Sequence, residues 1–205
     1  MKRTLAIFFC TLLLFSGILQ AQPEGTEENL METLKIYMGF VENKDMAGTL
    51  DYIHPALFEM VPQEILQTAM EQAFSDTTVE ISLHDAKINK IHDIISTESG
   101  SYTLVDYSFV MDMKMNPEED EEESEGEGEN EFDAMGMMIS MLEMQYGEEN
   151  VSLNEEEQLV TIKTEKTLYA ILEPDFDSWK FLEKKDQMIG LFNKVIPEEV
   201  RKELK

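Results

Sequence analysis

The first part of the chain carries apolar residues at helical spacing. Over residues 26–43 they recur every three or four positions, which predicts an amphipathic helix with Thr26 as its N-cap. A short helix is expected over 45–52 and another helical turn from Pro55, because proline suits the first helical position. A further helix is expected over 62–74. The chain therefore begins with a group of helices.

After these helices the apolar pattern changes to a period of two, which is typical of strands. The stretch TVEISL alternates, and the longest alternating stretch covers residues 102–115. The later elements, predicted from their own periodicity, are a helix over 132–146, strands over 158–164, 166–172 and 178–183, and helices over 186–195 and 198–204. A strand is also expected over 86–96.

Helices that precede a run of strands predict an α+β fold, with the helices packed on one face of an antiparallel sheet. A strand as long as 102–115 must twist or curve. We therefore expect a cone-like sheet that curves over the N-terminal helix and encloses an apolar interior. No internal repeat divides the chain, so we expect one domain over residues 22–205.

The N-terminal segment has the layout of a secretory signal peptide. Lys2 and Arg3 give a basic start, and an apolar run over 5–19 leads to small Ala21. The run of about 15 residues is shorter than the roughly 20 needed to span a bilayer. We expect residues 1–21 to be removed and the rest to be a soluble periplasmic or extracellular protein without stable membrane insertion. Cys10 is the only cysteine, so the mature chain has no disulfide and no thiolate.

The chain is strongly acidic, with a net charge of −27. Residues 118–133 contain 11 carboxylates and no basic residue. Such a surface repels nucleic acid and anionic membranes, so we expect neither as a partner. Residues 117–131 have almost nothing to bury and cannot offset the entropy of ordering, which predicts a disordered insertion. Deleting residues 118–131 is expected to leave folding intact.

The order of elements resembles the NTF2-like (cystatin-like α+β, SnoaL-like) superfamily. The resemblance covers residues 29–184 and is carried by "LKIYMGFVENKDMAGTLDYIHPALFEM" and "TLYAILEPDFDSWKFLEK". The strand with Trp179 and Phe181 is similar to the closing strand of that superfamily. The acidic insertion and the helices after the last strand depart from its pattern. The tail "LFNKVIPEEVRKEL" also resembles that of small exported proteins of Bacteroidetes-type bacteria.

The resemblance implies an apolar pocket that holds a small molecule. Some members are isomerases, hydratases or dehydratases that place an Asp, His or Tyr there, and others bind without catalysis. The weak catalytic candidates are His54, Asp106 and Tyr107, and the pocket candidates are Tyr37, Phe58, Tyr107, Phe109, Met111 and Trp179.

No spacing forces the catalytic candidates together. His54 is expected to be a polar turn residue, His84 and His92 are expected to face solvent, and Asp106 lies on the polar face of its strand. We therefore expect a non-enzymatic exported module, without a cofactor, that binds an apolar small molecule or a protein. An NTF2-like isomerase or lyase is the alternative.

The methionines suggest a second alternative, which is metal handling by methionines and acids. Thioethers can bind Cu(I), and the chain has two methionine sets: Met111, Met113 and Met115, and Met135, Met137, Met138, Met141 and Met144. Methionine also fills cores, and each set follows the period of its own element. The acidic stretch does not match a calcium-binding loop, and the histidines lack zinc spacing. We expect no metal site, and we expect charged residues at 138 and 141 to prevent folding.

Overall fold

The computed structural model describes residues 25–116 and 130–204, with backbone only for 130–134. The expectations for residues 1–21 fall outside this range, as do most of those for 117–131. Four helical segments form the first part of the described chain, close to the predicted positions: α1 (Glu27–Glu42), α2 (Met46–Asp51), η1 (Pro55–Leu57) and α3 (Gln63–Ser75). The Thr26 side chain accepts a hydrogen bond from the Asn29 amide at 3.2 Å and caps α1 as predicted.

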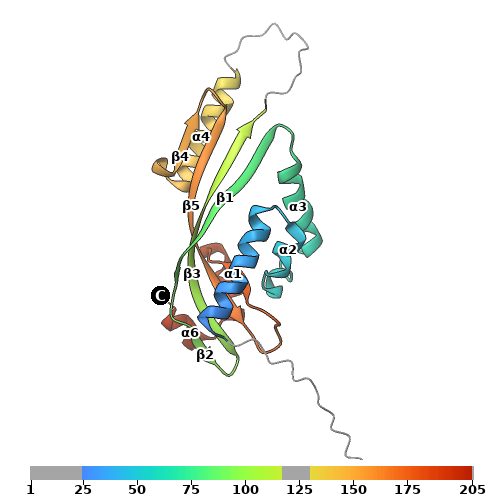
Figure 1. The fold of residues 1–205 in the computed structure, drawn as a ribbon, viewed down its shortest axis with the longest axis vertical. Coiled ribbons are helices and arrows are strands. Elements are labelled where there is room, and N and C mark those ends of the chain that lie inside the picture. Colours follow the sequence, from blue (N-terminus) through green and yellow to red (C-terminus); the bar gives the residue numbers. More distant parts are fainter. Residues whose placement is uncertain (1–24, 117–129, 205) are drawn as a thin grey trace, which may run out of the picture.

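Within the described residues, six strands form one antiparallel sheet in the order β1-β3-β5-β4, with β2 beside β3 and β6 beside β5. Their bounds are β1 (Val79–Ile91), β2 (Ile95–Thr97), β3 (Gly100–Met115), β4 (Val151–Asn154), β5 (Leu159–Leu172) and β6 (Lys180–Glu183). The predicted α+β class, with N-terminal helices packed on an antiparallel sheet, is confirmed. Figure 1 shows α1, α2 and α3 together on one side of the long, twisted strands.

Three strand predictions were wrong in detail. Residues 158–164 and 166–172 were expected as two strands, but β5 runs straight through Glu165 and pairs with β3 without a register shift. The strand expected over 86–96 is divided between β1 and β2, and β4 was not predicted. Thr164, Glu165 and Lys166 resembled a turn because all three are polar, yet Thr164 is 3% exposed and its hydroxyl donates to the Phe109 carbonyl within the sheet.

The edge strand β1 is bent. Asp85 has a φ of 56°, and the pairing with β3 shifts between His84 and Lys87. At this bend the Ala86 amide donates a hydrogen bond to a carboxylate oxygen of Glu42 at 2.9 Å. The last turn of α1 is therefore fastened to the sheet where β1 leaves regular pairing.

One core lies between α1 and the sheet. Leu30 and Leu34 are fully buried there, and burying each contributes roughly 1.5–3 kcal/mol. They pack with side chains from β3, β5, β6 and the turn before β6: Val105, Tyr107, Leu168, Ala170, Leu172, Trp179 and Phe181. The alternation of β3 and β5 places these residues on one face of the sheet.

A second core covers the opposite face at the same end of the sheet. It contains Tyr102 and Leu104 of β3 and Tyr169 and Ile171 of β5. The covering elements are η3 (Asp186–Met188), α5 (Ile189–Val195) and α6 (Glu198–Glu203), whose buried residues are Leu191, Phe192, Ile196, Val200 and Leu204. Helices therefore cover both faces here, whereas the sequence suggested only one face.

Helix α4 (Asn130–Tyr146) is followed by η2 (Glu148–Asn150) and lies against β4 and β5 at the other end of the sheet (Figure 1). The helix exists as predicted, but it begins inside the range expected to be disordered. Its methionines do not all turn inward, because Met141 is 68% exposed and Met144 is 86% exposed. Met138 is half-buried. The exposure of Met141 removes the physical reason to expect that a charge at residue 141 prevents folding.

This difference predicts unequal effects of charge on α4. Met138→Glu is expected to lower the free energy of unfolding by about 1–3 kcal/mol, because it places a carboxylate at a half-buried position. Met141→Glu is expected to change it by no more than about 0.5 kcal/mol. Urea unfolding followed by circular dichroism measures both, and equal destabilisation by the two variants would contradict this account of α4.

Candidate functional site

An apolar cavity of about 250 Å³ lies between the N-terminal helices and the sheet. Its apolar lining comes from α2, the segment through η1, α3, the sheet and η3: Leu50, Ile53, Leu57, Leu66, Met70, Leu168, Phe181, Leu182 and Met188. Its polar lining consists of Tyr37, Thr49, Tyr107, Glu183 and Lys185. The cavity forms where the inner faces of these short helices meet the sheet without filling the space between them.

Aromatic packing fixes the two tyrosines of the cavity. The Tyr37 ring from α1 lies 4.8 Å from the Phe181 ring, centroid to centroid, and 6.4 Å from that of Tyr52. The Tyr107 ring from β3 stacks on Phe109 at 6.1 Å. Such contacts leave each ring little freedom. The two hydroxyl groups are thus held by a helix and by the central pair of strands.

The electrostatics of the cavity keep both phenols protonated. Burial raises the pKa of Tyr37 to about 12, with a smaller contribution from the Glu183 carboxylate. Burial also raises the pKa of Tyr107 far above its usual value, helped by Tyr37 and Glu183. Glu183 itself forms ion pairs with Lys166 at 3.0 Å and with Lys185 at 3.1 Å. At neutral pH the cavity therefore offers two uncharged hydroxyl donors beside the Glu183 carboxylate, which is ion-paired with two lysines.

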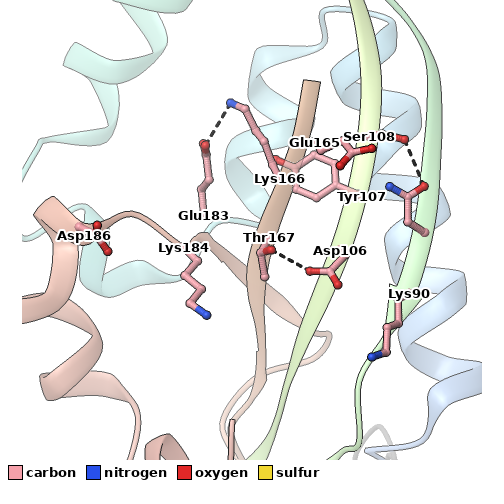
Figure 2. A pocket seen from close by; sticks show the side chains of 11 residues that line it. Lys90, Asp106, Tyr107, Ser108, Glu165, Lys166, Thr167, Glu183, Lys184 and Asp186 are labelled. Carbon is pink, nitrogen blue, oxygen red and sulfur yellow. Dashed lines mark hydrogen bonds and ion pairs between the residues drawn. The ribbon is translucent and has the colours of Figure 1, made fainter. Parts of the chain in front are cut away.

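A second, open hollow of about 880 Å³ borders β5, and we call it the polar trough. It is lined by Asn89, Lys90, Asp106, Tyr107, Ser108, Glu165, Lys166, Thr167, Glu183, Lys184 and Asp186. Figure 2 shows these side chains, with the Lys166–Glu183 pair on one side of β5 and the Thr167–Asp106 hydrogen bond between β5 and β3. Acidic and basic side chains are mixed along it, so it presents no surface of one charge sign.

Two similar groups of hydrogen bonds cross the polar face of the sheet. Asp106 receives Thr167 Oγ1 at 2.7 Å and lies 2.8 Å from His92 Nε2. Asp112 receives Thr161 Oγ1 at 2.6 Å and lies 3.0 Å from His84 Nε2. In both groups the carboxylate stands in the middle. The threonine hydroxyl therefore donates to the acid and not to the imidazole, which excludes activation of that hydroxyl by the histidine in this geometry.

These hydrogen bonds shift two pKa values. The hydrogen bond with Asp112 raises the pKa of His84, and Asp85 adds to the effect. Partial burial opposes the change at Asp106, but the hydrogen bonds from Thr167 and His92 lower its pKa overall. The groups are best explained as links that join neighbouring strands. Both histidines were expected to face solvent: the His84 side chain is 44% exposed, whereas that of His92 is 23% exposed.

His54 was expected to be a polar turn residue, and the structure places it, buried, at the N-cap of η1. It is 4% exposed, its Nδ1 accepts the Ala56 amide at 3.1 Å, and its Nε2 lies 3.4 Å from Glu173. Because Nδ1 accepts, Nε2 carries the proton and donates to Glu173. Burial lowers the pKa of His54, although Glu173 opposes this. The neutral ring therefore caps η1 and holds the loop before β6.

The structure separates most of the residues singled out in the sequence. Tyr37 and Tyr107 line the apolar cavity together, Tyr107 also lines the polar trough beside Asp106, and His54 lines neither. Trp179 is fully buried in the core, and its Nε1 has no hydrogen-bond partner among the described residues. The other pocket candidates do not line the cavity: Phe58, Phe109 and Met111, all half-buried.

Sequence reasoning missed Glu183, Lys166 and Lys185. The two cavities share Glu183, and both lysines pair with it. The sequence offered one indication for Glu183: it is a charged residue directly after Leu182, at the end of the last predicted strand. The lysines come from a segment taken for a turn and from beyond the strand, so their approach to Glu183 depends on the tertiary fold.

Within residues 25–116 and 130–204, no three histidine, cysteine or acidic side chains gather closely enough to hold a metal ion. No helix in the described part of the chain is long and apolar enough to cross a membrane.

The two shifted histidines predict opposite pH dependences. The raised pKa of His84 gives stability that is present below its unfolded pKa of about 6.5 and is lost as the pH rises through the folded pKa. The lowered pKa of His54 gives stability that is present above about pH 6.5 and is lost as the pH falls through the folded pKa. His84→Asn should therefore lower the free energy of unfolding more at about pH 5.5 than at about pH 8. His54→Asn should lower it more at about pH 8 than at about pH 5.5.

Urea unfolding of both variants and the wild type at the two pH values measures these differences. The asparagine at position 54 keeps a side-chain acceptor for the Ala56 amide and serves as the matched replacement. The same direction of change in both variants would contradict the assigned protonation states.

Comparison with known proteins adds no relative to this picture: no family model, no curated protein and no solved structure matches the chain.

Proposed function

We propose that this chain is a non-enzymatic binding protein that takes a small apolar molecule into the cavity between α1, α2, α3 and the sheet. One observation carries the proposal. The apolar cavity has aliphatic and aromatic walls with only a few polar groups, which is the usual composition of small-molecule sites. Its 250 Å³ corresponds to roughly eight water molecules at about 30 Å³ each, so the ligand is small.

The arrangement of acids and bases favours binding over catalysis. A proton-transfer enzyme needs a free base within reach of a bound substrate. Asp106 accepts hydrogen bonds from two neighbours outside the cavity, and His54 caps η1. Glu183 is the one carboxylate among the described residues that lines the cavity, and it is paired with two lysines. An isomerase or lyase of the NTF2-like type has less support for this reason.

We also propose that the chain is exported and is related to the NTF2-like superfamily. The signal-peptide pattern supports export. N-terminal helices on an antiparallel sheet support the relationship. An isolated parallel bridge between Ile53 and Phe181 joins the segment after α2 to β6 and so connects the helical part of the chain to the sheet.

A cavity-filling substitution tests the proposed site. Indole is a small, largely apolar probe, and at ten times its Kd it should raise the free energy of unfolding of the wild type by about 1.4 kcal/mol. Leu66→Trp fills the cavity from α3 and is expected to abolish this stabilisation while the circular dichroism spectrum stays native. Chemical-shift titration gives the Kd, and unfolding with and without indole gives the stabilisation.

Gln72→Trp is the matched control, because Gln72 is exposed on the same helix and does not line the cavity. It should leave indole binding unchanged. Failure of indole and of similar small apolar probes to bind the wild type would show that the cavity is not a ligand site, and unchanged binding to Leu66→Trp would place the site elsewhere.

A further inference from the structure

The apolar cavity and the polar trough have two lining side chains in common. Tyr107 and Glu183 line both hollows. They come from β3 and from the end of β6, and between them β5 has no strand partner on its outer edge. Strand β4 pairs with residues 159–162 of β5, and β6 pairs with residues 168–171. In the described sheet, residues 163–167 of β5 therefore have no neighbouring strand on this edge. The boundary between the hollows is therefore a pair of side chains and not a continuous sheet.

Glu183 is held at this boundary by contacts that can exchange with water. Its partners are Lys166 at 3.0 Å and Lys185 at 3.1 Å. The side chains of Glu183 and Lys166 are 30% and 26% exposed, and that of Lys185 is 50% exposed. Ion pairs with this much exposure stabilise a structure only weakly. Figure 2 shows the Lys166–Glu183 pair at the side of the trough.

The chemistry at the boundary selects against charged ligands. A carboxylate in the cavity would lie near the Glu183 carboxylate, and an ammonium group would lie near the Lys185 ammonium group. The hydroxyl groups of Tyr37 and Tyr107 make no hydrogen bond to another described residue, so both remain available. A hydroxyl or carbonyl oxygen on a ligand can accept from them without bringing a charge into the apolar cavity.

We propose that the ligand is an uncharged amphiphile with a short apolar body and one hydroxyl or carbonyl head, and that it enters from the polar trough past Glu183. The apolar body fills the cavity under α3, and the head lies at the boundary beside Tyr37 and Tyr107. This inference rests on the proposed binding function and adds the ligand class and the entrance. The Glu183 carboxylate, which offsets part of the positive charge of Lys166 and Lys185, acts as a specificity group that weakens the binding of anions.

Three six-carbon probes that differ only in the head group test the inference: 1-hexanol, hexanoate and hexylammonium. Kd values come from chemical-shift titration of the purified protein at neutral pH. 1-Hexanol should bind at least about tenfold more tightly than either ion, because only the ions lose hydration of a charge. In Glu183→Gln the Kd for hexanoate should fall by about fivefold, because the repulsion between two unit charges about 4 Å apart in water is removed. The Kd for 1-hexanol should change by less than about twofold.

Glu198→Gln is the matched control, since Glu198 pairs with Lys202 on α6 and lines neither hollow. It should leave all three Kd values unchanged. If Glu183→Gln does not fold, Lys185→Gln gives the test: by removing a cation beside the boundary it should weaken hexanoate binding further and leave 1-hexanol binding unchanged.

The outcomes separate this inference from the binding function. Tightest binding of either ion, or no response of hexanoate to Glu183→Gln, overturns the ligand class and the role of Glu183. Binding of indole without binding of 1-hexanol overturns the inference and leaves the cavity as a site for apolar molecules. Failure of every probe, indole included, overturns both.

Discussion

The continuous pairing of β3 with β5 is the constraint on which the rest of the structure depends. Fourteen residue pairs follow one register from Ser101 with Leu172 to Lys114 with Leu159. Because side chains alternate along a strand, a slip by one residue would exchange the two faces of the sheet. Tyr107 would then leave the cavity and Asp106 would enter it. Both the core under α1 and the polar face therefore depend on this register.

The same alternation gives neighbouring residues opposite roles. Asp106 joins β3 to His92 and to Thr167 of β5, while the next residue, Tyr107, points between the sheet and the helices. A long strand with different elements on its two faces can hold a polar network and an apolar cavity only one residue apart. The carboxylate and the phenol consequently cannot act on the same bound molecule inside the cavity.

Local periodicity was sufficient to predict α1, β3 and the α+β class, because each of these elements has one apolar face that the core requires. It failed where tertiary contacts decide. Glu165 and Lys166 resemble a turn, yet pairing with β3 keeps them in β5. Met141 fits the period of α4 but lies on its exposed side. Of the pocket candidates, Tyr37 and Tyr107 line the cavity, whereas the approach of Glu183 to Lys166 and Lys185 joins segments that no local pattern relates.

The bend in β1 has a consequence for how the molecule behaves in a crowded solution. A long strand at a sheet margin is a template for recruiting strands from other molecules, which leads to aggregates. Here the left-handed turn at Asp85 interrupts the template, and the Glu42 carboxylate occupies the Ala86 amide that an incoming strand would use. Charged side chains such as Lys87 and Lys90 stand along the remainder. A sheet with an unpaired edge strand can thus still resist strand pairing with other copies of the same chain.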